Sequence, residues 1–263
     1  MKRMQRKLRV IARLDVKDEN LVKGIQYEGL RKLGPPHGFA LKYYRQEVDE
    51  LLYLDTVASL YERNNLGGIL RDTTEDVFIP ITAGGGLRSA EDVGAVLAAG
   101  ADKAAINTAA LRRPALIAEV ARAFGSQCMV LSIQAKRRDP GDPSAGWEAY
   151  YDNGREHSGR DVVEWARQAA ALGAGEILLT SVDSEGLQRG MDLELVAAVA
   201  QKVNVPVIAA GGARGAGDLA ACARAGAAAA AVGSLLHYGK AGVQELKEGL
   251  EAEGVGVRRC RAW

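Results

Sequence analysis

Residues 82–111 read TAGGGLRSAEDVGAVLAAGADKAAINTAAL, and residues 209–236 read AAGGARGAGDLAACARAGAAAAAVGSLL. Both stretches contain a short apolar run, two or three glycines, a helical stretch and a second apolar run. In each stretch the end of the first apolar run is 23 positions before a pair of small residues that follows the second run. This spacing runs from Gly84 to Asn107 (followed by Thr108) in the first stretch, and from Ala210 to Gly233 (followed by Ser234) in the second. This self-similarity indicates a duplicated strand–helix–strand unit.

Outward from these stretches, β-rich runs alternate with helical stretches along the chain. We expect strands at Leu8–Asp15, Glu50–Asp55, Ile79–Ala83, Lys103–Ile106, Met129–Gln134, Glu176–Ser181, Val207–Ala210 and Ala229–Val232. We expect helices at Ser89–Ala99, Pro114–Phe124, Asp161–Leu172, Leu193–Lys202 and Ala216–Ala225. Alternation repeated eight times implies a parallel sheet that can close, so the predicted fold is α/β, a (βα)8 barrel built from two (βα)4 half-barrels.

The length of the chain fits this architecture. The 263 residues match the roughly 250 that a (βα)8 barrel takes as one domain. No Pro/Ser-rich linker divides the chain, so we expect a single domain over residues 1–263. The repeat places Asp15 of the first half opposite Gln134 of the second. The segment Arg138–Ser158, rich in proline and glycine, is expected to be a long loop near the active site.

Composition excludes several classes of protein. A net charge of +1 gives no electrostatic case for nucleic-acid binding. Three scattered cysteines, Cys128, Cys222 and Cys260, form no CxxC motif, so we expect no metal site and no disulfide framework. We therefore expect the protein to reside in the cytoplasm, a reducing environment. The basic N-terminus lacks an apolar core, and the most apolar stretch, Leu219–Leu236, is interrupted by Arg224. No secretory signal and no membrane span are therefore expected.

The glycine runs predict phosphate binding. Glycines after a strand let backbone N–H groups approach a phosphate, and a following helix adds partial positive charge. The first half offers Gly84–Gly86 with Asn107 and Thr108, and the second offers Gly211 and Gly212 with Gly233 and Ser234. Tight turns are the alternative interpretation. Because the glycine motif occurs twice in matched register, we favour a ligand that carries a phosphate at each end. The sequence indicates no cofactor.

Three aspartates stand at the carboxyl ends of predicted strands and are candidates for proton transfer: Asp15 and Asp55 end their strands, and Asp183 follows one. Asp15, Asp55 and Asp183 stand where side chains point into the mouth of a barrel, at which catalysis occurs. For Asp55 and Asp183, capping or bracing of a loop is an equal alternative. Asp15 is favoured as functional.

The motifs LDVKD, LDTVAS, TAGGGLRS, GADKAAINTAA, FGSQ, IQAKR, GAGEILLTSVD and AAGGA resemble the cyclase subunit of imidazole glycerol phosphate synthase, the HisF family. The resemblance covers about Arg9 to Arg258. It implies a barrel that takes ammonia from a glutaminase partner (HisH-like), with which it forms a heterodimer. The implied reaction converts a bis-phosphorylated ribulosyl-formimino carboxamide nucleotide to imidazole glycerol phosphate and aminoimidazole carboxamide ribotide.

The resemblance also implies roles for individual residues. Asp15 matches the first catalytic aspartate, and Lys23 is expected in the mobile loop after the first strand. Substrate and phosphate contacts are implied for Asp55, Gly85, Gly86, Asn107, Thr108, Thr180, Gly186, Gly211, Gly212, Gly233 and Ser234. At the opposite end, an ammonia gate is implied for Arg9, Glu50, Lys103 and Glu176, for which a structural ion-pair network is the alternative. Asp102 and Gln127 match positions that meet the glutaminase.

The sequence departs from the family pattern at positions expected to take part in the reaction. Gln134 occupies the second catalytic aspartate position, and an amide cannot act as a general acid or base. Arg13 shares strand parity with Asp15, so we expect it inside the barrel, paired with Asp15 or a ligand anion; an outward-facing Arg13 is the alternative. Glu185 and Leu187 replace an aspartate and a threonine of the family pattern.

Three functions are compatible with these observations. The first is the ammonia-dependent lyase/cyclase of histidine biosynthesis with altered proton handling. The second is a paralogue that, with a glutaminase, delivers ammonia to a sugar amidotransferase in surface-polysaccharide synthesis. The third, a related isomerase of histidine synthesis, would need two carboxylates and has no reason to keep the charged ring, so we rank it last.

Overall fold

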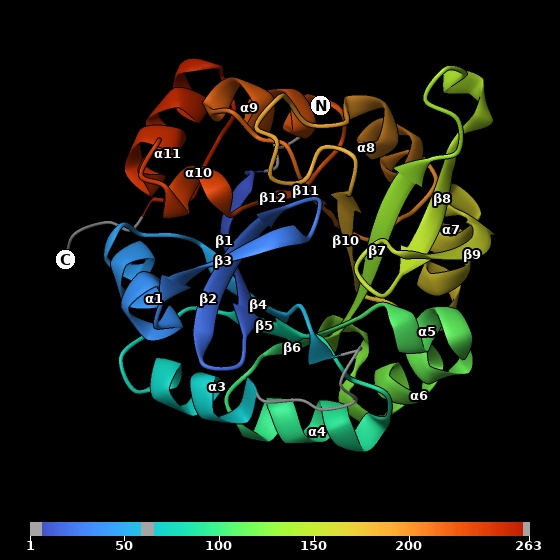
Figure 1. Ribbon diagram of the computed structural model, residues 1–263, viewed down its shortest axis with the longest axis horizontal. Helices are drawn as coiled ribbons and strands as arrows, with labels where there is room; N and C mark the ends of the chain where they lie inside the picture. The colour runs from blue at the N-terminus through green and yellow to red at the C-terminus, as the bar shows by residue number, and fades with distance from the viewer. Residues whose placement is uncertain (1–6, 59–65, 260–263) are drawn as a thin grey trace, which may run out of the picture.

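The computed structural model describes residues 7–58 and 66–259, and its central strands close into a barrel surrounded by helices (Figure 1). The barrel strands are β1 (Arg9–Lys17), β4 (Glu50–Asp55), β5 (Ile81–Gly84), β6 (Lys103–Ile106), β7 (Met129–Arg137), β10 (Glu176–Ser181), β11 (Val207–Ala210) and β12 (Ala229–Val232). They pair in this order, all parallel, and β12 pairs with β1 to close the ring. The predicted (βα)8 barrel is confirmed.

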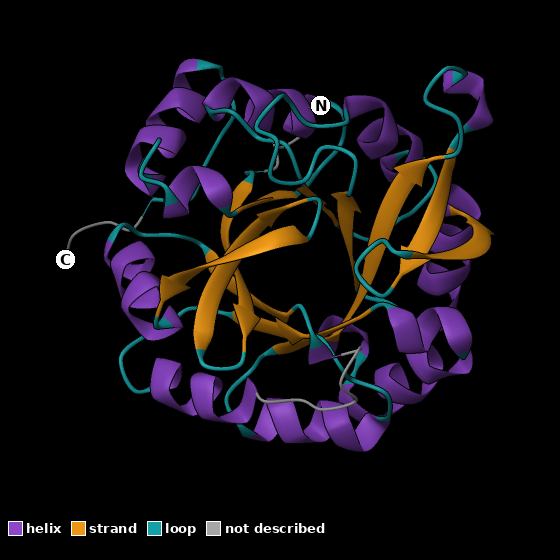
Figure 2. Ribbon diagram, viewed as in Figure 1, coloured by secondary structure: helices purple, strands orange, loops and turns teal. Residues whose placement is uncertain are grey.

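Helices form the outer layer of the barrel (Figure 2). The longer ones are α1 (Pro36–Arg45), α3 (Leu66–Thr74), α4 (Ala90–Ala98), α6 (Ala115–Phe124), α7 (Val162–Leu172), α8 (Leu193–Ala200), α9 (Ala216–Arg224) and α11 (Val243–Ala252). Local sequence sets their ends: Ser89 and Asp92 form a capping box on α4, and the Asp161 carboxylate accepts two backbone N–H groups at the start of α7. Gly173 ends α7 in the left-handed conformation.

Each half of the barrel has the same additional elements. A hairpin follows the first strand of each half: β2 (Asn20–Ile25) and β3 (Glu28–Gly34) after β1, and β8 (Trp147–Tyr151) and β9 (Glu156–Asp161) after β7. A short helix follows the last strand of each half, α5 (Thr108–Arg112) and α10 (Ser234–His237). This correspondence supports the duplication predicted from the sequence.

The long loop predicted at Arg138–Ser158 is wrong in part. The segment contains β8 and the start of β9, because the aromatic residues of Trp147–Tyr151 favour a strand that pairs with β7. Proline and glycine mark only the hairpin tip, which holds the short 3₁₀ helix η2 (Pro143–Ala145). A second 3₁₀ helix, η1 (Ser126–Cys128), precedes β7. Strands β1 and β7 run longer than predicted because both continue into their hairpins.

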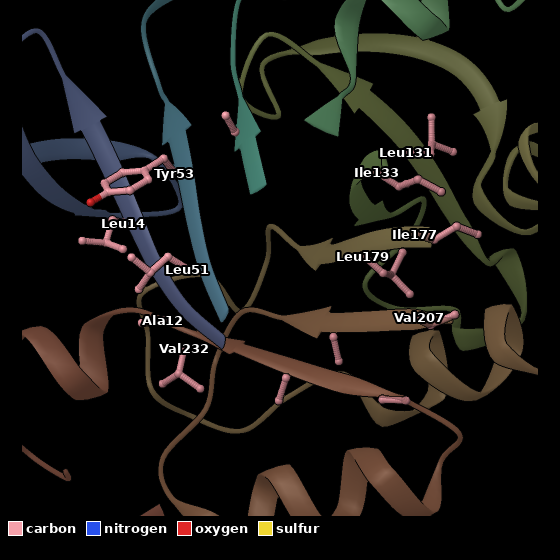
Figure 3. Close-up of a cluster of buried hydrophobic side chains, with 14 of the residues drawn as sticks. Ala12, Leu14, Leu51, Tyr53, Leu131, Ile133, Ile177, Leu179, Val207 and Val232 are labelled. Atoms are coloured by element: carbon pink, nitrogen blue, oxygen red, sulfur yellow. The ribbon is translucent and has the colours of Figure 1, made fainter. Parts of the chain in front are cut away.

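The hydrophobic core lies mainly between the strands and the helices. Figure 3 shows side chains of this layer projecting from several barrel strands, among them Leu14, Leu51 and Ile177. Trp165 of α7 is the largest fully buried side chain among the described residues. Because side chains alternate along a strand, the residues between them point into the barrel.

The inward positions change character along the barrel axis. On β1, Arg9, Ile11, Arg13 and Asp15 follow one another with the period of two. The apolar layer at the height of Ile11 contains a separate buried cluster of Ile11, Leu52, Ala105, Val130, Leu178, Ile208, Ala210, Ala229 and Ala231. An apolar layer therefore separates a charged end of the barrel from a polar mouth.

A buried ion pair connects the last long helix to the first barrel strands. Lys247 of α11 and Asp49 have side chains that are 1% exposed, and Lys247 Nζ lies 2.9 Å from Asp49 Oδ1. Lys247 also donates to the carbonyl oxygens of Glu47 and Arg258, and Asp49 Oδ2 accepts the N–H of Val10. All three ammonium protons thus have acceptors.

We expect Lys247→Met to destabilise the fold. The change leaves the Asp49 carboxylate buried without its cation, which typically costs about 3–5 kcal/mol. Urea unfolding monitored by circular dichroism measures the loss. In the exposed pair of Arg167 with Glu164, Arg167→Met should cost less than about 1 kcal/mol, and equal losses in the two variants would contradict this expectation.

Candidate active site

The first candidate phosphate site is open. We call Gly85, Gly86, Asn107 and Thr108 the first cradle; they line a cavity of about 280 Å³ at the carboxyl ends of β5 and β6. A Cβ on Gly85, whose φ is +105°, would lie 2.3 Å from the carbonyl oxygen of Asp55, so only glycine fits there. The cavity is also lined by three arginines, Arg88, Arg112 and Arg113. Its shape and charge suit an anionic group.

Two polar groups of the first cradle have defined partners. Asn107 donates through Nδ2 to the carbonyl of Tyr150 (3.1 Å), while its Oδ1 is buried without a hydrogen-bond partner among the described residues. A ligand that donates a hydrogen bond would satisfy this oxygen. Asp55 lines the same cavity, and its Oδ1 accepts the N–H groups of Val57 and Ala58. Asp55 therefore braces its own loop at least in part, as the alternative interpretation stated.

The second candidate phosphate site is nearly filled. We call Gly186, Gly211, Gly212, Gly233 and Ser234 the second cradle; they border a cavity of only about 20 Å³ together with Arg13 and Glu185. Gly211 and Gly212 have φ values of +97° and +90°, which favour glycine. Thr180, predicted at the mouth, lies with its Oγ1 3.5 Å from Nη1 of Arg13, which lines this cavity. Both glycine motifs thus lie at the same end of the barrel, on different strands.

A buried ion network fills the mouth beside the second cradle. We call Arg13, Asp15, Lys23 and Glu185 the mouth network; they are between 1% and 5% exposed. Asp15 accepts from Arg13 Nε and from Lys23 Nζ, both at 2.8 Å. Lys23 also bonds Glu185, and Arg13 Nη1 lies 3.6 Å from that carboxylate. Tyr27 OH accepts from Arg13 Nη2 at 2.8 Å. The predicted pairing of Arg13 with Asp15 is confirmed, and Arg13 faces inward.

The mouth network fixes the charge state of Asp15. Burial alone would raise the pKa of Asp15, but the charges of Arg13 and Lys23 outweigh it and hold the pKa well below its ordinary value. Burial likewise opposes the charge of Lys23, yet Asp15 and Glu185 keep the pKa of Lys23 above its ordinary value. Asp15 is therefore a carboxylate at neutral pH, able to accept a proton or a hydrogen bond and not to donate one.

Gln134 lies at the mouth but outside this network. Its Oε1 accepts the N–H of Gly154 at 2.9 Å, and its Nε2 lies 3.5 Å from Asn153 Oδ1, both in the turn between β8 and β9. Gln134 and Asn153 line the first cavity. The β8–β9 hairpin thus contacts the neutral amide of Gln134, and the β2–β3 hairpin contacts the charged carboxylate of Asp15 through Lys23.

The predicted ring at the opposite end of the barrel is a closed set of ion pairs. Arg9 bonds Glu50 (2.5 Å) and Glu176, and Lys103 bonds Glu50 (3.0 Å) and Glu176 (2.9 Å). Each cation contacts both anions, so the ring is neutral. Asp102, beside Lys103, accepts the N–H of Ile81, and the exposed Gln127 lies at the same end before β7.

Sequence reasoning missed parts of the site. Tyr27 and Asn153 were not singled out, although both lie in short turns with positive φ and border the first cavity. The neighbouring glycines, Gly29 and Gly154, were a signal for these turns. Asp183 accepts the N–H of Arg137, which supports its bracing interpretation. Cys128 and Cys222 are free, and Cys260 lies outside the described residues.

Two absences hold for the residues that the structure describes. No three His, Cys, Asp or Glu side chains within 7–58 and 66–259 gather as a metal site would require. Over the same ranges no helix has both the length and the apolar character to cross a bilayer.

A duplicated barrel with glycine cradles and a polar mouth at one end defines an enzyme of the α/β-barrel class. Comparison with known proteins specifies the family. A family model described as "Histidine biosynthesis protein" matches residues 9–242. A Legionella pneumophila protein named imidazole glycerol phosphate synthase subunit HisF is 59% identical over 205 residues, which are 78% of this chain and 95% of the relative.

Further relatives carry the same name. The protein from Mycobacteroides abscessus is 48% identical, and that from Bifidobacterium adolescentis is 45% identical; the alignments cover 95% of this chain and 98% of each relative. The chain belongs to the histidine biosynthesis family, among proteins named HisF. The family resemblance read from the motifs is therefore confirmed.

One half-buried histidine lies behind the mouth and hydrogen-bonds to the backbone of β1. His237 Nε2 lies 2.9 Å from the carbonyl of Arg13, and its Nδ1 lies 2.7 Å from Tyr43 OH. A carbonyl only accepts, so Nε2 carries the proton. Burial lowers the pKa of His237 to about 4, and the charge of Lys23 acts in the same direction.

We expect acid to destabilise the protein through His237. Between pH 6.5, the ordinary pKa, and about 4, the unfolded chain binds a proton that the folded protein does not. Stability should fall by up to about 1.4 kcal/mol per pH unit as the pH drops through this window. Urea unfolding at about pH 7, 6 and 5 should show a shallower slope for His237→Gln. An unchanged slope for His237→Gln would contradict the expectation.

Proposed function

We propose that this protein is the ammonia-dependent cyclase subunit of an imidazole glycerol phosphate synthase in histidine biosynthesis. Its substrate would be the bis-phosphorylated ribulosyl-formimino carboxamide nucleotide, with ammonia from a glutaminase partner. The names and identities of the relatives support this proposal. In the structure, the observation that carries it is the placement of a charged ring and a two-cradle mouth at opposite ends of the same eight strands.

The layers of the barrel suit the delivery of ammonia. The ring offers both carboxylates and cations to a small polar molecule at the surface. The apolar cluster between the ring and the mouth would favour neutral ammonia over ammonium, since an ion loses its hydration there. Asp102 and Gln127 lie at the ring end, where we propose that the glutaminase binds. The word "subunit" in the relatives' names supports such a complex.

At the mouth, we assign Asp15 the handling of protons. Held as a carboxylate, it can accept a proton or stabilise a developing positive charge on the substrate. Gln134 can orient the substrate by hydrogen bonds and cannot transfer a proton. Residues of the two cradles, Asn107 among them, would bind the two phosphates, and Thr180 would contact the substrate beside the second cradle. One proton-transfer group where the family has two predicts slow turnover. We also place the protein in the cytoplasm, as a single domain.

The second candidate is the paralogue that delivers ammonia to a sugar amidotransferase. Two observations favour it: Gln134 replaces a titratable group, and Arg13 binds the carboxylate of Asp15 at 2.8 Å. Both changes weaken proton transfer and leave the ring intact. In this role, the barrel would conduct ammonia and bind partners.

We expect turnover of the bis-phosphorylated nucleotide by the purified protein at saturating ammonium. Asp15→Asn should lower kcat by about 10²–10⁴-fold, because it removes the remaining proton-transfer group. Gln134→Asp should raise kcat, because it restores the second carboxylate. Asp76→Asn, an equivalent change on an exposed residue outside the mouth, provides the control. Product formation is followed by the absorbance of the aminoimidazole product.

The same assay separates the two candidates. No turnover by the wild type, together with turnover by Gln134→Asp, would contradict the cyclase proposal and favour ammonia delivery. Turnover by the wild type that is unaffected by Asp15→Asn would remove Asp15 from the mechanism.

A further inference from the structure

The second cradle already contains an anion from the chain itself. A Cβ built on Gly211 would lie 3.4 Å from Glu185 Oε2, so this carboxylate stands against the backbone of the cradle. A Cβ built on Gly233 would lie 3.6 Å from Lys23 Cε, which places Lys23 against the other side. The remaining cavity of about 20 Å³ is too small for a phosphate group. The position beside the cradle glycines and the two cations is therefore taken by Glu185.

The charges around Glu185 balance. Arg13 and Lys23 provide two positive charges, and Asp15 and Glu185 provide two negative ones, all in buried side chains. A phosphate that entered without displacing a carboxylate would add an uncompensated charge to a buried site, which is costly. A phosphate that replaced Glu185 would leave about one negative charge less in the site than one that entered beside it, and would offer the two cations more acceptor oxygens than a carboxylate does.

The hairpin β2–β3 keeps this arrangement closed. The backbone N–H of Gln26 donates to the carbonyl of Glu185 at 2.9 Å, and Gln26 Nε2 donates to the carbonyl of Asp183 at 2.9 Å. Gly186 packs so closely that a Cβ there would lie 2.5 Å from the carbonyl oxygen of Gly24. Figure 1 shows the hairpin across the barrel opening beside β1. Lys23 and Glu185 are thus held together by backbone contacts as well as by charge.

The first cradle differs in all these respects. Its cavity is about 280 Å³, and three arginines line it. Asp55 is the one carboxylate among its described lining residues, and its Oδ1 is bound to the backbone of its own loop. A phosphate can therefore enter the first cradle without displacing an internal anion.

We infer that Glu185 is an internal substitute for the second phosphate and determines how strongly the second cradle binds one. A ligand with two phosphates would first occupy the first cradle, and its second phosphate would then replace Glu185 beside Lys23 and Arg13. A ligand with one phosphate would occupy the first cradle alone. This inference rests on the proposed function only in assigning the two cradles to phosphates of one ligand.

Titration with inorganic phosphate tests the inference without turnover. By isothermal titration calorimetry, the wild type should bind one phosphate per chain in the millimolar range or tighter. Glu185→Gln keeps the size of the side chain and removes its charge, so it should bind a second phosphate with a Kd at least about tenfold below any second event in the wild type. Glu185→Asp shortens the reach of the carboxylate and should give an intermediate second Kd.

The controls locate the second event. Glu148→Gln makes the same change at another buried glutamate, which bonds Gly159 and His157 outside both cradles, and should bind one phosphate. Adding Ser234→Asp to Glu185→Gln returns a negative charge to the second cradle and should abolish the gain.

Two results would overturn the inference. One is tight binding of two phosphates by the wild type; the other is a second event no stronger in either Glu185 variant than in the wild type. If Glu185→Gln does not fold, Glu185→Asp decides alone. A protein that gains the second phosphate as described but converts no nucleotide would retain this inference and lose the proposed cyclase activity.

Discussion

Strict alternation of side chains between the inside and the outside of a closed barrel determines the arrangement of this molecule. Once β7 pairs with β10 and β12 with β1, every second residue of each strand has no place but the interior. On β1 these residues are Arg9, Ile11, Arg13 and Asp15. A shift of one residue would exchange them for the apolar residues that contact the helices. The ring, the apolar layer and the mouth therefore form together or not at all.

Electroneutrality is the second constraint, and it acts at both ends of the barrel. The ring joins two cations to two carboxylates, and so does the mouth network. The ring cations are 18–19% exposed, whereas the mouth network is almost completely buried. The two clusters thus have the same number of charges but differ in exposure. Solvent molecules can reach the ring, whereas the closed mouth network excludes them.

Much of the fold followed from the sequence because the repeat imposed a register. All eight barrel strands were predicted to within a few residues, and so were the five helices named in advance. The hairpins were missed for two reasons. Apolar and polar residues alternate only weakly in β2 and β3, and the prolines and glycines at 139–146 led to the prediction of a loop that included Trp147–Tyr151. Strand parity placed Arg13 inside the barrel, paired with Asp15 or a ligand anion, and the structure pairs it with Asp15. The contact of Lys23 with Glu185 joins positions 162 apart in the sequence, and no local pattern encodes it.

The two halves of the barrel also complete each other at the mouth. β1 lies next to β12, so the hairpin of the first half covers the cradle of the second. β7 lies next to β6, and the hairpin of the second half borders the cradle of the first through Asn107 and Thr108. A half-barrel separated between β6 and β7 would keep its own cradle and lose its cover. Each binding site is therefore assembled from residues of both halves, so the closure of the ring and the completion of the sites are one event.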